Sequence, residues 1–109
     1  MVRVTILKTR HGKYAGFNTS GHAEYSEGPD IVCAACSVLV INTINAIETF
    51  TDDLFHVSSN QETGEIRFRF ESVPAERSTL LIDSLVLGLQ SMEESSEYGP
   101  YIDVIIREV

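Results

Sequence analysis

The sequence predicts an α+β protein in which one mixed β-sheet packs with two helices, in the order ββαββαβ. Five short segments alternate apolar and polar residues, as strands do, and two longer segments carry apolar residues at steps of three and four, as helices do. The 109 residues, of which 43% are hydrophobic, fit one compact domain over residues 1–109. A chain of this size buries roughly two-thirds of its unfolded surface, so its core needs no disulfide or metal.

The first two strands are predicted to form a hairpin. Residues 2–7 alternate in polarity and are rich in β-branched side chains, and residues 10–13 are typical of a turn. Residues 14–22 continue with strand-forming residues and small residues, so the second strand is expected to end near His22. Residues 23–29 have no periodicity and contain both Gly and Pro, which predicts a loop that is a candidate lid.

A long amphipathic helix is predicted over residues 31–50. Asp30 is typical of a helix N-cap, because its carboxylate can accept hydrogen bonds from free amides of the first turn. Residues 51–53 are expected to end the helix. Its apolar residues recur at three- and four-residue steps and comprise Ile31, Ala34, Ala35, Val38, Leu39, Ile41, Ile44 and Ile47.

The second half of the chain predicts a hairpin, a helix and a last strand. Residues 54–58 and 65–71 have strand patterns on either side of a polar turn. Residues 74–94 form the second helix, before Gly and Pro end it. The expected core face of this helix comprises Leu80, Leu81, Leu85, Leu89 and Met92. Residues 101–107 are predicted to be a well-buried strand.

Composition narrows the expected partners and location. Eight Lys and Arg against sixteen Asp and Glu give a formal charge of -8 at pH 7, which opposes binding along a phosphate backbone, so no direct nucleic-acid contact is expected. Half of the basic residues lie within residues 3–13, and the acidic remainder suits a basic partner. No uninterrupted apolar stretch approaches the ~18 residues that span a bilayer. The basic start also lacks the apolar run of a signal peptide, so a cytoplasmic protein with no membrane contact is expected.

The densest cluster of chemically capable residues runs from Ser20 to Ser37. It joins a histidine at the end of a strand, His22, to a cysteine near the start of a helix, Cys33. With Asp30 as the N-cap, Cys33 is the third helical residue, where free amides and the helix dipole favour a thiolate. The imidazole of His22 can take the thiol proton and later protonate a leaving amine. The pair therefore indicates thiol catalysis, with Cys33 as the nucleophile and His22 as the general base and acid.

Three neighbours are candidate supporting residues. Asp30 is better suited to capping the helix than to catalysis, because its charge would disfavour a nearby thiolate. Ser37 lies one turn after Cys33, where its hydroxyl could donate to the site or bond back to a helix carbonyl. Gly21 precedes His22 at the end of the strand.

The same residues leave other functions open. Cys33-Ala34-Ala35-Cys36 is a CxxC motif, and such a motif near a helix start is typical of thiol-disulfide oxidoreductases. A zinc site needs about four ligands, and the two cysteines with His22 supply only three, so neither a metal nor a cofactor is predicted. The protein could also be a non-catalytic interaction domain whose thiols pack in the core.

Two motifs in this cluster are specific. Ser20-Gly21-His22-Ala23 follows the second strand, and Gly28-Pro29-Asp30-Ile31-Val32-Cys33-Ala34-Ala35-Cys36-Ser37 opens the first helix. Together they resemble the ribosomal-processing cysteine protease (Prp) family, which pairs Gly-His-Ala after the second strand with Asp-Ile-Val-Cys-Ala-Ala-x-Ser at a helix start. The element order and length agree with that family over essentially the whole chain.

The resemblance implies a cytoplasmic, homodimeric endopeptidase that removes a short N-terminal extension from large-subunit ribosomal protein twenty-seven. It implies Cys33 as nucleophile, His22 as base, and Asp30 and Ser37 as supporting residues. It also implies a hydrophobic pocket near residues 23–29 for an aromatic residue that precedes the cleaved bond.

The sequence departs from the family's pattern at Cys36, where a small aliphatic residue is expected. A disulfide between Cys33 and Cys36 would switch off the nucleophile, although helix residues three apart accept such a bridge only with local strain. We treat this disulfide as a hypothesis.

Overall fold

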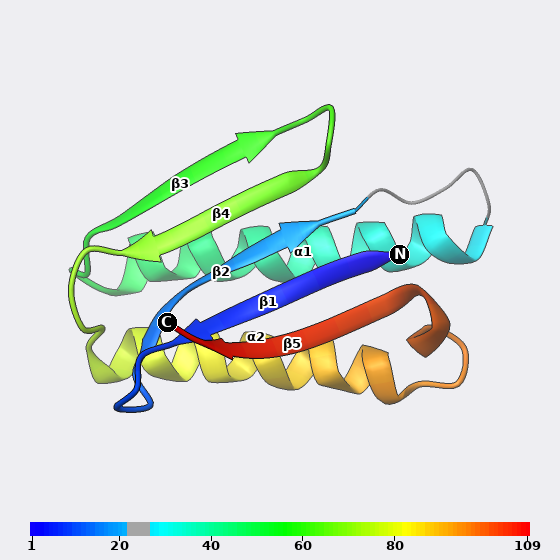
Figure 1. Ribbon diagram of the computed structural model, residues 1–109. Helices are drawn as coiled ribbons and strands as arrows, with labels where there is room; N and C mark the ends of the chain where they lie inside the picture. Colours follow the sequence, from blue (N-terminus) through cyan, green and yellow to red (C-terminus); the bar gives the residue numbers. More distant parts are fainter. Residues whose placement is uncertain (22–26) are drawn as a thin grey trace.

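The computed structural model describes the backbone of residues 1–21 and 27–109, and the side chains of these residues except 27–30. The order ββαββαβ and the α+β class are confirmed (Figure 1). The elements are β1 (Val2–Lys8), β2 (Tyr14–Ser20), α1 (Glu27–Phe50), β3 (Phe55–Asn60), β4 (Glu65–Phe70), α2 (Glu76–Glu94), the short 3₁₀ helix η1 (Gly99–Tyr101) and β5 (Ile102–Glu108).

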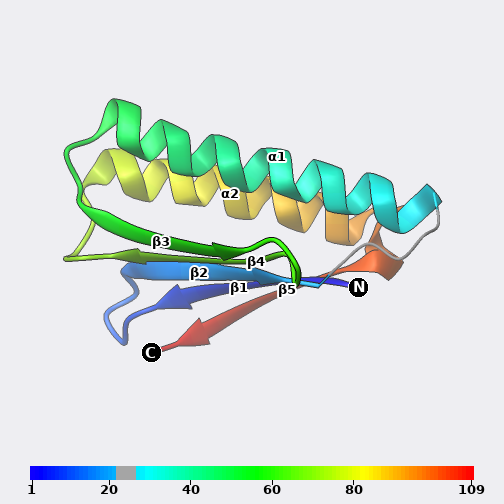
Figure 2. The same ribbon diagram turned by 90° about the horizontal axis from the view of Figure 1, so that it is seen from above.

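The five strands form one mixed sheet in the order β3-β4-β2-β1-β5. Neighbouring strands are antiparallel except β1 and β5, which run parallel with Val2 opposite Ile102. A parallel pair needs a crossover connection, and α2 lies on the crossover that leads to β5. Both helices lie on one face of the sheet (Figure 2).

The core fills the space between the sheet and the two helices. On the sheet, the rings of Phe17 and Phe68 are fully buried and stack with centroids 4.9 Å apart. Fully buried side chains from the helices complete the core: Val32, Val40 and Ile47 from α1 and Ile82 and Leu89 from α2. One face of the sheet is therefore covered by helices, as the alternating strand patterns predict.

Helix α1 begins at Glu27, so the prediction that it begins after an Asp30 N-cap is wrong. Pro29 permits this longer helix, because amides in the first turn have no acceptor within the helix and a proline there loses no hydrogen bond. Asp30 is consequently the fourth helical residue, and Cys33 is the seventh rather than the third. Residues 23–26, the first part of the predicted loop, lie outside the described residues.

Part of the predicted core is exposed. Ile31 and Val38 of α1 are 46% and 67% exposed, because the opposite side of the helix, with Val32 and Val40, faces the sheet. Leu80 of α2, expected in the core, is 67% exposed. The prediction of a well-buried last strand is also wrong, because β5 is an edge strand whose last three residues are exposed.

The segment Ile31–Phe50 of α1 is long and apolar enough to cross a membrane, judged by length and composition alone. The core helices of soluble proteins pass the same test. Here the side of α1 that carries Val32, Val40 and Ile47 belongs to the hydrophobic core beneath the helices. We therefore describe α1 as a core helix.

Candidate active site

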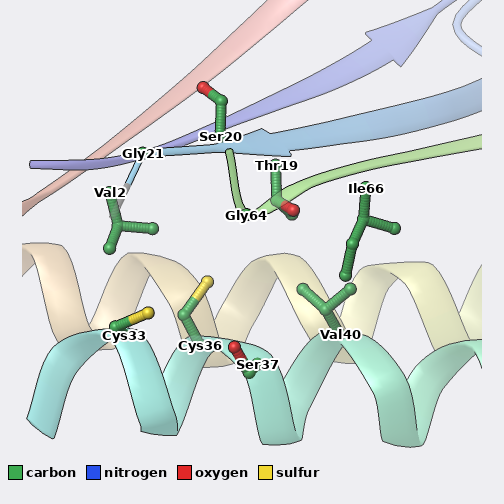
Figure 3. A pocket seen from close by; sticks show the side chains of 10 residues that line it. All are labelled: Val2, Thr19, Ser20, Gly21, Cys33, Cys36, Ser37, Val40, Gly64 and Ile66. Atoms are coloured by element: carbon green, nitrogen blue, oxygen red, sulfur yellow. The ribbon is translucent and has the colours of Figure 1, made fainter. Parts of the chain in front are cut away.

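A small pocket lies between α1 and the end of the sheet (Figure 3). Its volume is about 60 Å³. Three of the predicted site residues, Gly21, Cys33 and Ser37, line it together with Cys36. The structure thus brings the end of β2 and the cysteine-bearing turn of α1 to one place.

The two thiols differ in their exposure. Cys33 is partly exposed, and its sulfur is directed along the helix toward Cys36 (Figure 3). Cys36 is 3% exposed and belongs to the hydrophobic core. Burial, with a smaller contribution from Cys33, raises the pKa of the Cys36 thiol to about 11. At neutral pH Cys36 is therefore a protonated thiol, and Cys33 is the thiol that a substrate can reach.

The Ser37 hydroxyl is available to the pocket. Other helical hydroxyls donate to the carbonyl four residues earlier, as Thr43 does to Leu39 at 2.7 Å and Ser91 does to Leu87 at 2.9 Å. Ser37 makes no hydrogen bond of this kind, and its hydroxyl has no partner among the described residues. It can therefore donate to a group that enters the pocket.

Gly21 fixes the path of the backbone beyond β2. Its φ is +94°, a backbone angle that residues with a side chain rarely adopt. A Cβ atom at this position would also lie 2.1 Å from the carbonyl oxygen of Met1. Only glycine meets both conditions, so the chain can pass the start of β1 and remain at the edge of the pocket.

The side chains of two predicted site residues lie outside the part of the chain that the structure describes. His22 lies outside the described residues, as does the side chain of Asp30, whose backbone belongs to α1. Within the described part of the chain, no group of three or more His, Cys, Asp or Glu is arranged to hold a metal ion.

Sequence reasoning missed several walls of the pocket. Val2, Thr19, Gly64 and Ile66 line it from three strands and a turn. Thr19 is 6% exposed and pairs with Ile66 in the sheet register. No local pattern reveals such long-range pairing, and the only available signal was strand alternation, which places Thr19 on the same face as Phe17.

The pocket is too small for an aromatic side chain. A volume of about 60 Å³ compares with about 150 Å³ for an engineered cavity that binds benzene. This pocket is therefore not the aromatic pocket expected near residues 23–29, and the side chains of that segment lie outside the described residues.

Three glutamates belong to segments at the end of the molecule that carries the pocket. The β3–β4 turn and the end of α2 lie there, near the start of α1 (Figure 1), and they bring Glu62, Glu93 and Glu97. The β1–β2 turn, with Arg10 and Lys13, lies at the opposite end (Figure 1). The end of α1 and the start of α2 lie at that opposite end too (Figure 1) and bring Asp52, Asp53 and Glu76, so acidic residues occur at both ends of the molecule.

Comparison with known proteins gives consistent similarities. The model of the family described as "Cysteine protease Prp" matches residues 1–103. The chain is 29% identical over 103 residues to the ribosomal processing cysteine protease Prp of Staphylococcus aureus (strain Mu50), and the match covers 94% of this chain and 95% of that protein.

Two crystal structures of Prp from S. aureus resemble the fold described above. The structure in complex with a substrate peptide has a TM-score of 0.89 at 27% identity, and covers 98% of this chain and 100% of that chain. The structure in complex with a covalently linked product peptide has a TM-score of 0.87 at 28% identity with the same coverage.

Proposed function

Because the chain belongs to the cysteine protease Prp family and is therefore a peptide-bond hydrolase, we propose that Cys33 is its nucleophile and His22 its general base and acid. The proposed substrate is the precursor of large-subunit ribosomal protein twenty-seven, from which the enzyme removes the N-terminal extension. The proposed catalytic unit is one domain over residues 1–109.

The observation that carries this proposal is that Cys33 and Gly21 line one pocket. His22 follows Gly21 directly in the sequence, and consecutive Cα atoms are about 3.8 Å apart, which supports a role for this histidine at the pocket. The other two histidines belong elsewhere. His56 on β3 bonds Glu71 at 2.8 Å, and His11 lies in the β1–β2 turn at the opposite end of the molecule (Figure 1).

In the proposed reaction, the His22 imidazole removes the proton from the Cys33 thiol, and the thiolate attacks the carbonyl carbon of the scissile bond. The tetrahedral intermediate collapses as the imidazolium protonates the leaving amine, which leaves the acyl group on sulfur. A water molecule, deprotonated by His22, then hydrolyses the thioester and restores the thiol. The covalently linked product peptide of the S. aureus protein supports such a covalent step.

The position of Cys33 in α1 assigns a larger role to His22 than the sequence suggests. Stabilisation by a helix dipole falls off within the first turn, and Cys33 is the seventh residue of α1. The thiolate therefore depends mainly on its ion pair with the imidazolium. Ser37 is proposed to donate a hydrogen bond to the thiolate or to the developing oxyanion. Asp30 and Gly21 are proposed as supporting residues, Gly21 through the backbone path that it allows.

The charge of the chain supports a basic substrate. Ribosomal proteins bind RNA and are commonly rich in Lys and Arg, and this chain has a formal charge of -8 at pH 7, with Glu62, Glu93 and Glu97 in segments at the pocket end. Complementary charge raises the rate of encounter at low salt. The relative in S. aureus, named as a ribosomal processing protease, supports the same substrate class.

We further propose that the enzyme is a cytoplasmic homodimer without membrane or nucleic-acid contacts. The outer helical face, defined as the exposed apolar side chains that point away from the sheet, supports a contact between two copies. Its members are Ile31, Val38 and Ile41 of α1 and Leu80 and Leu87 of α2, which are 46–68% exposed. Grouped apolar side chains of this kind are typical of protein contact surfaces.

The test is to incubate the precursor ribosomal protein with the wild type and with variants, and to measure the intact masses of the products. We expect the wild type to release the extension, and Cys33→Ala and His22→Ala to slow release by at least about a hundredfold. Cys36→Val should retain activity, because it replaces a buried thiol with a side chain of similar size. His11→Ala and His56→Ala are matched histidine controls that should cleave normally.

Each part of the proposal can fail separately. Wild-type activity in Cys33→Ala or His22→Ala, with circular dichroism showing intact folds, would contradict the assigned roles. A precursor left whole by the wild type would contradict the substrate. A loss in Cys36→Val equal to that in Cys33→Ala would instead favour a thiol-disulfide oxidoreductase.

A further inference from the structure

The second thiol of the pocket, Cys36, has no part in the proposed mechanism, yet it lies beside the nucleophile. We propose that Cys36 is a resolving thiol: when a hydroperoxide oxidises Cys33, Cys36 closes a disulfide with it and arrests the enzyme reversibly. This inference rests on the proposed role of Cys33 as the nucleophile.

The positions of the two cysteines on α1 permit the bridge. They are three residues apart, and helix geometry places their Cα atoms about 5 Å apart, within the roughly 4.4–6.8 Å that disulfides usually span. Both line the same pocket, and the sulfur of Cys33 is directed toward Cys36 (Figure 3). The bridge therefore needs side-chain rotation and local adjustment of one helical turn, with no movement of one element relative to another.

Burial gives the two thiols different roles. Cys33 is partly exposed, so an oxidant meets it first. Cys36 is 3% exposed and packs in the core, and burial raises the pKa of its thiol to about 11. Because thiolates rather than thiols react with peroxide, Cys36 is protected from direct oxidation. Its raised pKa also slows its attack on an oxidised Cys33, so the resolving step depends on the place of Cys36 beside Cys33 in the same pocket.

The size of the pocket admits a small oxidant. A volume of about 60 Å³ is several times the roughly 10–15 Å³ that one water molecule needs, so hydrogen peroxide can enter. The proposed device is therefore expected to respond to hydrogen peroxide.

The chemistry balances with hydrogen peroxide as the oxidant. The Cys33 thiolate attacks one peroxide oxygen, the O–O bond breaks, and the released hydroxide takes the proton that had left the thiol, giving a sulfenic acid and water. The sulfur of Cys36 then attacks the sulfur of Cys33, the S–O bond breaks, and the hydroxide leaves with the Cys36 thiol proton as a second water. The two thiols have lost two electrons and two protons, and a dithiol reductant reverses the change.

The experiment exposes reduced wild type to hydrogen peroxide, removes the peroxide, and divides the sample between two measurements. In the first, the protein is unfolded, its free thiols are alkylated, and its intact mass is recorded. We expect both thiols to be lost, together with the mass of two hydrogen atoms. In the second, cleavage of the precursor should fall by at least about tenfold and should recover after dithiothreitol.

Cys36→Val is the matched variant, because it keeps the nucleophile and removes only the resolving thiol. We expect its Cys33 to gain two or three oxygen atoms, and its activity to stay lost after dithiothreitol, since sulfinic and sulfonic acids resist that reductant.

The outcomes separate this inference from the proposed function. If reduced wild type cleaves the precursor, but peroxide adds oxygen to Cys33 and leaves Cys36 alkylatable, the resolving role is wrong and the protease stands. Disulfides between two copies, seen as a doubled mass, would also overturn it. If reduced wild type fails to cleave, the proposed function is wrong, whatever the state of the thiols.

Discussion

The carbonyl oxygen of Met1 lies 2.1 Å from the place that a Cβ atom on Gly21 would occupy. The end of β2 and the start of β1 therefore meet where only a glycine fits. We expect Gly21→Ala to lower the melting temperature and to slow cleavage by more than about tenfold, because the segment that leads to His22 must shift. Thermal unfolding and the precursor cleavage assay measure the two effects.

Gly12→Ala is the control for this prediction. Gly12 also has a positive φ, +77°, but nothing lies within 4 Å of its ideal Cβ position. Its substitution should cost only the backbone strain, about 1–2 kcal/mol, and should leave cleavage by the folded enzyme unchanged. Equal losses of cleavage in the two variants would contradict a specific role for Gly21.

Removal of the Ser37 hydroxyl should affect catalysis more than stability. The hydroxyl has no partner among the described residues, so Ser37→Ala should change the free energy of unfolding by no more than about 0.5 kcal/mol. Loss of a donor to the developing charge should lower kcat by about tenfold or more. Ser91→Ala, which removes a hydroxyl that donates to Leu87 at 2.9 Å, serves as the control, and an unchanged kcat in Ser37→Ala would refute the assignment.

Burial of Cys36 predicts a loss of stability at alkaline pH. Its thiol pKa is raised from 9.0 to about 11, so between these values the unfolded chain releases a proton that the folded protein retains. The stabilisation is complete below pH 9 and is lost as pH rises through the folded pKa, by up to about 2–3 kcal/mol.

Denaturant unfolding of wild type and Cys36→Val at pH 8 and again near pH 10.5 tests this prediction. Tyr14, whose pKa is also raised, chiefly by burial and then by its hydrogen bond to Asp83, contributes equally to both proteins. Between pH 8 and pH 10.5, the free energy of unfolding of wild type should therefore fall by more than that of Cys36→Val. An equal fall in both proteins would show that the Cys36 thiol is not the cause.

The outer helical face predicts how the proposed dimer can be broken. Val38 is 67% exposed at the middle of that face on α1, so Val38→Glu should leave the fold intact while placing a charge in the contact. Light scattering after size exclusion should show a dimer for wild type and a monomer for the variant. Gln61→Glu, at an exposed polar position in the β3–β4 turn and outside the outer helical face, should remain dimeric, and a monomeric wild type would refute the proposal.

Local patterns were sufficient to predict the hairpins, both helices, and three residues that line one pocket, Gly21, Cys33 and Ser37. The start of α1 could not be predicted in the same way, because Pro29 is equally compatible with the residue before a helix and with its first turn. The side of α1 that faces the core was also ambiguous. This helix has apolar residues on both sides, so spacing alone does not distinguish Val32 from Ile31.

Long-range pairing explains what else was missed at the site. Thr19 and Ile66 belong to the pocket because β2 pairs with β4, and Val2 belongs to it because β1 pairs with the other side of β2. The exposed edge position of β5 likewise follows from strand order, which depends on contacts between distant parts of the chain. The motif around Cys33 was sufficient to predict a cysteine protease, whereas the residues of β1, β2 and β4 that line the pocket became evident only from the fold.

The parallel pairing of β1 with β5 sets the order in which the enzyme can mature. Val2 lines the pocket and lies opposite Ile102, so one wall of the site is held by a strand that the ribosome synthesises long after β1. Closing a loop of this length is entropically costly and slow. A nascent chain thus lacks a finished site until β5 has emerged and paired with β1, which delays proteolysis beyond the synthesis of the segment that carries Cys33.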